Sequence, residues 1–383
     1  MKFLHISDLH IGKVVNGFSM LRDQKFILNQ IITTAQSEEV DGILLAGDIY
    51  DRSIPTKEAV SLLDEFLTKL VAIGKEVYLI SGNHDSPERI DFAHNILEKK
   101  GLYISGVLKK EVKEIVREDS YGMVHIYLLP FATPKVMKYV LEQEDLDCTY
   151  HCCIEQFVKQ MKINPDERNI LVTHHFVIGN GETPIVSDSE VKNLVGGVEQ
   201  VDGAIFSEFD YVALGHIHRP QKVGRKTIRY AGSPIKYSFS EVNHEKTMTI
   251  VELKEKGQVI IKEIPLIPLH DMRILKGKLS DLLQKEVVEA GNREDFVQVI
   301  LTDKEELFEP MEQLRAVYPN IMQLVIEKNI KEERQVTFSS VYLTKRTTKQ
   351  LFEQFYETVV GQELEETQVQ LVEQLLDEVT YAK

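Results

Sequence analysis

Aspartate, asparagine and histidine gather in five short stretches of this sequence, and all three residue types bind divalent metal ions. The stretches are Asp8-Leu9-His10, Gly47-Asp48, Gly82-Asn83-His84, His174-His175 and Gly215-His216-Ile217-His218. This mixture of oxygen and nitrogen donors suits first-row divalent ions, and it contains neither cysteine nor methionine. One octahedral ion cannot use so many ligands, whereas two ions about 3.5 to 4 Å apart can if one carboxylate bridges them. The sequence therefore predicts a site for two metal ions.

Each stretch directly follows a predicted strand. The clearest strand is the unbroken apolar run 42–46, which is typical of a strand buried on both faces and which ends just before Asp48. The other four strands are expected at 2–7, 76–81, 169–173 and 210–214. Open α/β sheets bind ligands at the carboxyl ends of their strands, and a buried carboxylate there needs a cation to offset its desolvation. We expect Asp48, on the central strand, to bridge the two ions.

Apolar residues recur at helical spacing over 21–35 and 62–71, between the first three strands, so the amino-terminal part is predicted to be a βαβ sheet. Further elements are expected in later stretches: a hairpin-like region at 103–131, helices at 135–144 and 152–161, a long loop at 179–197, and a second sheet region completed by 247–253 and 259–264.

The proline-flanked segment Pro265-Leu266-Ile267-Pro268-Leu269 indicates a domain boundary after residue 264. Alternating strand and helix patterns beyond it predict a small α+β domain over 265–335. Residues 348–383 then form two amphipathic helices joined at Gly361. The apolar faces of this helical pair have two possible partners, its own domain or another protein.

The chain has 383 residues and a net charge of −15, so its overall charge gives no sign of nucleic-acid binding. A polyanionic substrate would have to be bound locally. One basic cluster follows the last histidine motif and could contact phosphates, although a solvated hairpin explains it equally well. Its members are Arg219, Lys222, Arg225, Lys226 and Arg229.

No basic segment followed by an apolar one opens the chain, and no uncharged run approaches the length of a membrane span, so we expect a cytoplasmic protein. Cys148, Cys152 and Cys153 lie close to His151, but their spacing is not that of a zinc site and free thiols are expected. Five other histidines are assigned to structural positions. They are His94, His125, His151, His244 and His270.

The motif series resembles the calcineurin-like metallophosphoesterase superfamily over roughly residues 1–264. It consists of Asp8-x-His10, Gly47-Asp48-x-x-Asp51, Gly82-Asn83-His84-Asp85, His174 and Gly215-His216-x-His218. The resemblance implies an α/β fold, a four-layer β-sandwich flanked by helices. It also implies that Asp8, His10, Asp48 and His218 hold one ion, and that Asp48, Asn83, His174 and His216 hold the other. The adjacent His175 could take the place of His174.

The resemblance further implies roles for three residues that are not ligands. His84 would donate a proton or hydrogen bond during hydrolysis, and Asp85 would orient it. Asp51 would hold a ligand histidine or the surrounding loop. Archaeal and eukaryotic relatives carry a histidine at the position of Asp51, so the fine mechanism of this chain is expected to differ from theirs.

Within the superfamily, residues 1–12, the run 47–51 with the following Pro55, and Tyr230-Ala231-Gly232-Ser233-Pro234 resemble SbcD-like nucleases. This resemblance implies a manganese-dependent DNA exonuclease and endonuclease that acts in DNA repair and recombination. It also implies that the helical pair 348–383 docks on the coiled coil of an SbcC-like ATPase. Two copies of each protein would then form a heterotetramer.

Two other functions compete with the nuclease. A small-molecule phosphodiesterase or phosphatase could use the same metal site, although it would need neither a capping domain nor a helical tail. A scaffold that had lost its metals is the third possibility, and the complete set of ligand residues argues against it.

Overall fold

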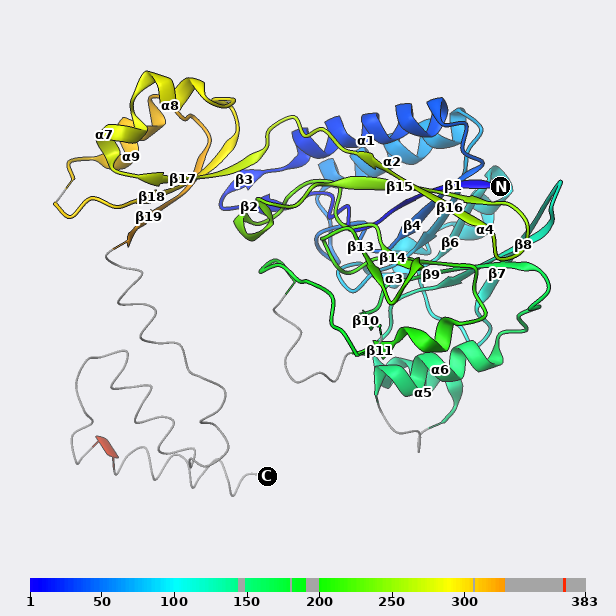
Figure 1. Ribbon diagram of the computed structural model, residues 1–383. Coiled ribbons are helices and arrows are strands. Elements are labelled where there is room, and N and C mark those ends of the chain that lie inside the picture. Colours follow the sequence, from blue (N-terminus) through cyan, green and yellow to red (C-terminus); the bar gives the residue numbers. More distant parts are fainter. Residues whose placement is uncertain (144–148, 180, 191–199, 306, 328–367, 370–383) are drawn as a thin grey trace.

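Two six-stranded sheets stack face to face, with helices covering the outer face of each (Figure 1). The computed structural model describes residues 1–143, 149–179, 181–190, 200–305, 307–327 and 368–369. Within this part of the chain, the layers run helix, sheet, sheet, helix. The predicted four-layer α/β sandwich is therefore confirmed.

The first sheet has the strand order β16-β15-β1-β4-β5-β6. Its strands are β1 (Lys2–Ile6), β4 (Gly42–Ala46), β5 (Glu76–Ile80), β6 (Leu102–Ser105), β15 (Thr247–Leu253) and β16 (Val259–Pro265). β1, β4, β5 and β6 are parallel, and helices α1 (Leu21–Ser37) and α2 (Lys57–Ala72) connect the first three. This arrangement is the predicted βαβ sheet.

The positions of β15 and β16 differ from our expectation. We assigned both to the second sheet region, but β15 pairs antiparallel with β1, placing Leu4 opposite Ile250, and β16 pairs with β15. The assignment was wrong because alternation of apolar residues identifies a strand without identifying its neighbour. The chain completes the second sheet and then returns to extend the first.

The second sheet has the order β13-β14-β12-β9-β8-β7. Its strands are β7 (Lys113–Asp119), β8 (Gly122–Leu129), β9 (Arg168–Thr173), β12 (Tyr211–Leu214), β13 (Gln221–Val223) and β14 (Arg225–Tyr230). The predicted hairpin is β7 with β8. Helices α5 (Pro134–Leu141) and α6 (Tyr150–Gln160) match the two predicted there and pack their apolar residues on this sheet.

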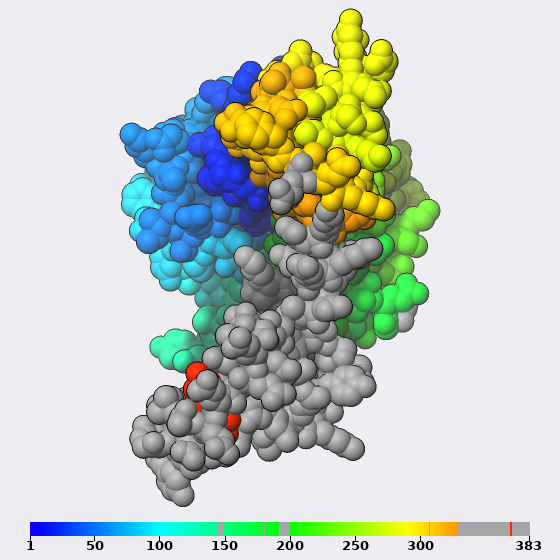
Figure 2. Space-filling model, turned by 90° about the vertical axis from the view of Figure 1, so that its left-hand side faces the viewer, coloured from blue at the N-terminus to red at the C-terminus, as the bar shows by residue number. Residues whose placement is uncertain are grey.

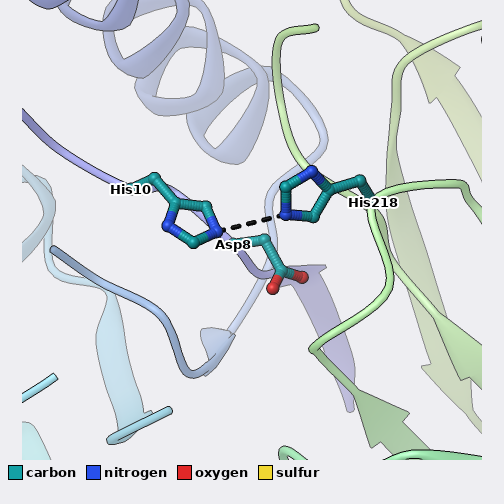
Figure 3. A group of neighbouring side chains, drawn as sticks. All are labelled: Asp8, His10 and His218. Atoms are coloured by element: carbon teal, nitrogen blue, oxygen red, sulfur yellow. Dashed lines mark hydrogen bonds between the residues drawn. The ribbon is translucent and has the colours of Figure 1, made fainter. Parts of the chain in front are cut away.

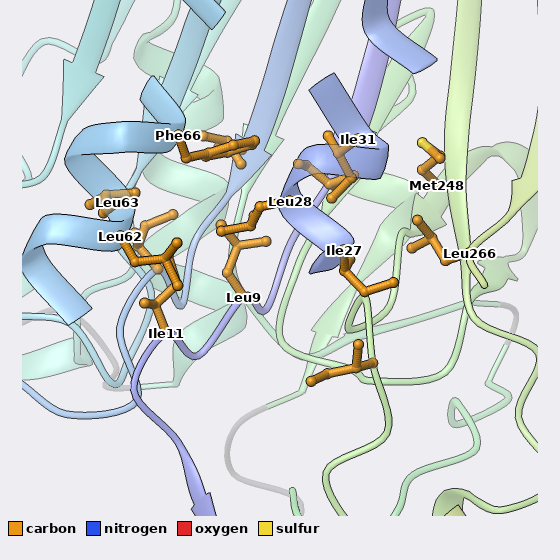
Figure 4. Packing of buried hydrophobic residues seen from close by; sticks show 14 of the residues in the cluster. Leu9, Ile11, Ile27, Leu28, Ile31, Leu62, Leu63, Phe66, Met248 and Leu266 are labelled. Atoms are coloured by element: carbon orange, nitrogen blue, oxygen red, sulfur yellow. The ribbon is translucent and has the colours of Figure 1, made fainter. Parts of the chain in front are cut away.

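Burial on both faces explains the apolar run of β4. Ile43 and Leu45 belong to the cluster formed with α1 and α2, part of which Figure 4 shows. Leu44 and Ala46 belong to the cluster between the two sheets. Because successive side chains point to opposite faces, a strand between two apolar layers needs apolar residues at every position.

A separate three-stranded parallel sheet follows residue 270 and has the element order that the sequence predicted. Its elements are β17 (Met272–Gly277), α7 (Leu279–Leu282), α8 (Lys285–Glu289), β18 (Phe296–Leu301), α9 (Pro310–Arg315) and β19 (Ile321–Ile326). Figure 2 looks onto this unit, in yellow and orange, with the amino-terminal part beside it. Met272, Phe296 and Met322 share an apolar cluster with the first sheet and α1, so the unit packs against the amino-terminal part through these side chains.

Short elements complete the described chain. They are β2 (Val14–Val15), β3 (Phe18–Ser19), α3 (Pro87–Ile90), α4 (His94–Leu97), β10 (Val177–Ile178) and β11 (Val201–Asp202). The predicted helical pair at 348–383 lies outside the described residues, apart from 368–369. Within the described ranges, no helix combines the length and apolarity needed to cross a membrane.

Candidate metal centre

The carboxyl ends of five strands meet at one edge of the stacked sheets. The first sheet brings residues that follow β1, β4 and β5, and the second sheet brings residues that follow β9 and β12. The sequence-predicted ligands that come together there are Asp8, His10, Asp48, Asn83, His174, His216 and His218. Residues separated by about 200 positions in the chain thus face one another.

Several of these residues have left-handed backbone conformations. The φ angles are 53° at Asp8, 42° at His10, 50° at Asp48 and 99° at His216. Each such residue costs on the order of 1–3 kcal/mol and persists only where its surroundings enforce it. Backbone hydrogen bonds do so here, from Asp8 N to Gly47 O at 3.0 Å and from His10 N to Asp48 O at 2.9 Å. Strain concentrated at one edge is typical of a functional site.

Three glycines immediately precede ligand residues because there is no space for a side chain. A Cβ at Gly47 would collide with the ring of His174, and a Cβ at Gly82 would collide with Asp48. At Gly215 it would meet both Ala46 O and His174. The Gly-Asp, Gly-Asn and Gly-His pairs in the motifs therefore reflect the close approach of the strand ends.

Asp8, His10 and His218 form one group of donor atoms (Figure 3). Their closest approach is 3.1 Å, between His10 Nε2 and His218 Nε2. Two ligands at right angles on one ion, each about 2.1 Å from it, lie about 3 Å apart, so this spacing fits a shared cation. Asp48 Oδ2 lies 3.5 Å from His10 Nε2.

A second group of donors lies around the same aspartate. His174 Nε2 is 3.4 Å from Asp48 Oδ2. Asn83 Oδ1 is 3.1 Å from His174 Nε2 and 3.0 Å from His216 Nδ1. One oxygen of Asp48 thus lies within 3.5 Å of a ligand candidate from each group, which is the position expected of a bridging carboxylate.

The protonation of the donors is mixed. Burial opposes the charge on His174 and His218, but Asp48 raises the pKa of His174 to about 9 and Glu241 raises the pKa of His218, so a metal ion would displace a proton from each ring.

Other donors are already suited to a cation. Burial lowers the pKa of His216 to about 3 and holds the pKa of His10 well below its usual value, so both rings keep a lone pair at neutral pH. Burial opposes ionisation of Asp48, but the neighbouring His174 holds the pKa of Asp48 well below its usual range. Burial raises the pKa of Asp8. A divalent cation between these groups would compensate the buried carboxylates.

The structure distinguishes between the two adjacent histidines. His174 Nδ1 donates to Ala46 O at 2.7 Å, which directs Nε2 towards Asp48. His175 points the other way, stacks on Phe131 with ring centroids 5.4 Å apart, and lies 2.9 Å from Thr173 Oγ1. Successive residues leaving a strand face opposite sides, so only His174 faces the centre.

His84 lies beside the first donor group, with its ring centroid 4.7 Å from that of His10. Its backbone N–H donates to Asp48 Oδ1 at 2.9 Å, and its Nδ1 donates to Asp51 O at 2.9 Å. The carbonyl of Asp51 therefore orients His84. This bond uses Nδ1, so Nε2 is the ring nitrogen of His84 that can act in the metal centre.

The hydrogen bonds of Asp85 run to the backbone, whereas we expected this residue to orient His84. Its buried carboxylate accepts hydrogen bonds from the N–H groups of Ile49, Tyr50 and Gly82, at 3.0, 2.9 and 2.8 Å. Burial and the nearby charge of Asp48 raise the pKa of Asp85 to about 6. Asp85 supports the loop after β4 because a short acid can satisfy several unpaired N–H groups at once.

Of the two roles predicted for Asp51, its contacts favour the second, which was to hold the surrounding loop. Its carboxylate binds Lys13 Nζ at 2.6 Å and stays 3.7 Å from His10 Nδ1, too far for a hydrogen bond. Asp51 thus holds the surrounding loop through Lys13 and does not hold a ligand histidine through its carboxylate. The histidine that it does position, through its carbonyl, is His84.

Two curated relatives match almost the whole chain. One is the SbcD component of nuclease SbcCD from Staphylococcus epidermidis, 33% identical over 378 residues, and the other is its counterpart from Staphylococcus saprophyticus subsp. saprophyticus, 31% identical over 379 residues. Each alignment covers 98% of this chain and 98% of the relative. The chain belongs to the SbcD nuclease family.

Two protein families match separate parts of this member of the SbcD family. The calcineurin-like phosphoesterase family matches residues 1–220, which is more than half of the chain and includes all seven proposed ligands. A family described as the type 5 capsule protein repressor C-terminal domain matches residues 268–360. The motif series therefore led to the correct superfamily and to the correct family within it.

The structure divides the basic cluster of this family member into two kinds of residue. Arg229 is buried and paired with Glu263, and Arg225 donates to the carbonyls of Phe206 and Phe209. Both arginines thus stabilise the fold, and the buried, ion-paired Arg229 is poorly placed for the predicted DNA contact. Lys222 and Lys226 are exposed on β13 and β14, and Arg219 is half-buried before them, so these three remain candidates.

Sequence analysis missed several polar residues that support the centre. Gln24 on α1 donates to Leu9 O and His10 O, and Tyr237 donates to Leu9 O. Four more surround His218. They are Ser189, Glu190, Glu241 and Lys246. None of these six residues belongs to a motif, so the sequence alone does not indicate that they support the centre.

Two of the three cysteines are described by the structure. Cys152 and Cys153 lie on α6, and Cys148 lies outside the described residues. Among the described residues, no group of potential metal ligands contains a cysteine. His151 instead accepts a hydrogen bond from the backbone N–H of Asp202.

Proposed function

We propose that this protein is the nuclease component of an SbcCD-like complex and that it hydrolyses DNA phosphodiester bonds with two bound Mn²⁺ ions. Its substrates would be duplex ends, as an exonuclease, and hairpins or single strands, as an endonuclease, in DNA repair and recombination. The observation that carries the proposal is the position of Asp48 Oδ2, which lies 3.5 Å from His10 Nε2 and 3.4 Å from His174 Nε2. A single carboxylate between two donor groups is the arrangement that a two-metal hydrolase needs.

The ligands divide between two ions that share one residue. Asp8, His10, Asp48 and His218 would hold the first ion, and Asp48, Asn83, His174 and His216 would hold the second. When bound, two divalent ions supply a nucleophile at neutral pH by lowering the pKa of water and neutralise the charge of the phosphoryl group. Oxygen and imidazole donors without thiolate favour Mn²⁺ over softer ions.

His84 is the proposed catalytic residue. Its Nδ1–H is held by the carbonyl of Asp51, and this fixes the ring so that Nε2 faces the centre. A protonated His84 can donate from Nε2 to the leaving oxygen while the carbonyl stabilises the charge on the ring. Asp85 keeps the loop beside Asp48 in place by accepting its backbone N–H groups.

The remaining assignments concern partners and location. Residues 265–335 would cap the nuclease domain of residues 1–264, and the helical pair 348–383 would bind the coiled coil of an SbcC-like ATPase. Two copies of each protein would form a heterotetramer in the cytoplasm. Arg219, Lys222 and Lys226 are the residues of the basic cluster proposed to contact DNA phosphates.

Cleavage assays distinguish this function from hydrolysis of small phosphodiesters. The purified protein, with and without its ATPase partner, is incubated with Mn²⁺ and either end-labelled duplex DNA, hairpin DNA or a chromogenic phosphodiester. Cleavage of both DNA substrates is expected. Hydrolysis of the chromogenic compound with no DNA cleavage under either condition would support a small-molecule phosphodiesterase instead.

Partner binding is tested separately by truncation. Removing the residues after 347 should abolish co-purification of the ATPase and leave Mn²⁺-dependent hydrolysis of the chromogenic compound intact. Retained co-purification would locate the docking surface elsewhere in the chain.

A further inference from the structure

A buried polar network encloses the side of His218 that faces away from the other donors. Its members come from two segments that follow no ligand motif, Ser187 to Glu190 and Ser233 to Lys246. Glu241 has an exposed fraction of 0% and Lys246 of 7%, so both charges are inside the protein. Buried charges are costly unless they are paired, and Lys246 Nζ lies 2.6 Å from Glu241 Oε2. The structure therefore maintains a buried ion pair directly behind a proposed metal ligand.

The hydrogen bonds of this network determine which nitrogen of His218 carries the proton. His218 Nδ1 lies 3.0 Å from Ser189 Oγ and 3.3 Å from Glu241 Oε1. Ser189 donates its single hydroxyl proton to Glu241 Oε1 at 2.8 Å, so towards Nδ1 it can only accept. The Glu241 carboxylate is also an acceptor. Nδ1 must therefore carry a hydrogen, and the neutral ring keeps its lone pair on Nε2.

Nε2 is the atom that faces His10, at 3.1 Å. Two Nε2–H groups at this separation would point their hydrogens at each other, so the tautomer imposed by the network is also the one that suits this side of the ring. In the neutral ring, the network thus leaves the electron pair on Nε2, where it is directed into the first donor group.

The backbone of the same histidine is held as well. Its N–H donates to Glu190 Oε1, and its carbonyl accepts from Lys246 Nζ at 2.8 Å. Lys246 also donates to Ser233 Oγ at 2.8 Å. By comparison, a single backbone carbonyl, that of Ala46, holds the outer nitrogen of His174. The first donor group therefore depends on distant side chains to a greater extent than the second.

We propose that Glu241 and Ser189 are positioning residues that fix His218 as its Nδ1–H tautomer and so determine the affinity of the first metal ion. Glu190 and Lys246 hold the backbone that carries this ring. The proposal rests on the proposed function, because it takes His218 to be a ligand. It adds that changes in the network act on the ion held by Asp8, His10, Asp48 and His218 and spare the other ion.

The first test measures Mn²⁺ binding to chelator-treated protein by calorimetry. In the double variant E241L/K246M both charges are removed together, which avoids leaving one of them buried and unpaired. One of the two binding events should weaken by about 10- to 100-fold, the usual effect of removing a group that orients a ligand histidine, and the other should stay unchanged. E241Q and S189A should show the same pattern with smaller changes.

A matched control is available at a histidine far from the centre. Glu114 Oε1 lies 2.6 Å from His125 Nδ1, so E114Q removes a comparable carboxylate from a histidine that is not a ligand. Both Mn²⁺ affinities should be unaffected in E114Q. With two equivalents of Mn²⁺ per chain, at a concentration that fills both wild-type sites, paramagnetic resonance should show the exchange-coupled signal of paired ions in wild type and E114Q. The mononuclear signal should grow in E241L/K246M.

The second test observes the tautomer directly, without metal and without activity. Nitrogen-15 spectra of histidine-labelled protein are recorded at a pH at which the ring is neutral, with His218 assigned from an H218Q sample. They should show the Nδ1–H form in wild type and a mixture of tautomers in E241L/K246M. An Nε2–H form in wild type would overturn the proposal. So would two unchanged Mn²⁺ affinities in a folded double variant.

The outcomes separate this proposal from the proposed function. If the double variant does not fold, the single variants E241Q and S189A provide the test. Unchanged Mn²⁺ affinities in both single variants would overturn the proposal. If wild-type protein binds only one Mn²⁺ ion, the two-metal function fails, while the tautomer of His218 still tests the role of Glu241 and Ser189.

Discussion

The two sheets contribute to the metal centre in different ways. The first sheet provides Asp8, His10, Asp48 and Asn83 from loops that are bonded to one another through their backbones, as in the bond from Asp8 N to Gly47 O. The second sheet provides histidines whose orientation depends on groups elsewhere, such as Ala46 O for His174 and Glu241 for His218. One half of the centre is built by neighbouring parallel strands, and the other half is positioned by long-range contacts.

This comparison predicts which changes affect both ions and which affect one. The shared carboxylate belongs to the first sheet, so its replacement should weaken the binding of both ions. Changes in the groups that support the histidines of the second sheet should weaken binding only in part.

The largest effect is expected from D48N. Asp48 is proposed to bind both ions, so replacing its carboxylate should remove the pair and lower Mn²⁺-dependent DNA cleavage by more than about 100-fold, beyond the effect of losing a group that only orients a ligand. Cleavage rates and Mn²⁺ stoichiometry by calorimetry measure this. A D48N protein that kept two bound ions would contradict the bridging role.

H84Q should lower the rate of cleavage without weakening metal binding, because His84 follows a strand of the first sheet but is not proposed as a ligand. Loss of a general acid costs typically about 10²- to 10⁴-fold, so cleavage should fall by that factor while Mn²⁺ and DNA binding are unchanged. Single-turnover cleavage, calorimetry and a DNA-binding assay with the same preparation provide the comparison. A fall in Mn²⁺ stoichiometry would show that His84 is a ligand.

G215A should displace the ligand histidines of the second sheet, because Gly215 leaves no space for a methyl group. The added Cβ would collide with Ala46 O and His174, and forced overpacking costs about 1–3 kcal/mol. Urea unfolding should show a stability loss of that size, and Mn²⁺ binding should weaken. G277A is the matched control, because a Cβ there would meet only Leu282 at an ordinary 3.4 Å. Equal stability of the two variants would contradict the close approach of the strand ends.

The smallest effect is expected outside the centre. K222A/K226A removes two exposed charges from the hairpin after His218, and it should weaken DNA binding uniformly and reduce the salt dependence of log affinity by about 2. The matched control is K159A/K162A, which removes the same charge from α6 and from the residues just after it. An unchanged salt dependence would show that the hairpin is only solvated.

Much of the centre could be predicted because its ligands adjoin strands with a clear pattern. The run Ile43 to Ala46 is apolar throughout since both faces are covered, and the motif glycines record contacts too close for a side chain. Both signals are local. They were sufficient to locate the strand ends and the residues that follow them.

Other features have no local signal. The pairing of β15 with β1 could not be predicted, because alternation in Thr247–Leu253 fits either sheet. Arg225 and Arg229 were read as DNA contacts because their charge is visible in the sequence, whereas the carbonyls and the carboxylate that they bind are distant. Asp85 was assigned to His84 because they are adjacent, although its partners lie on the loop after β4.

The sequence by itself determined the ligand types, their order and the strands that precede them, because these depend on residue identity and on spacing along the chain. Only the tertiary structure decided which adjacent histidine faces the centre and which charges support His218. Each of those choices depends on the direction of a side chain and on the partners it meets. Such partners are brought within about 3 Å only when the two sheets are stacked.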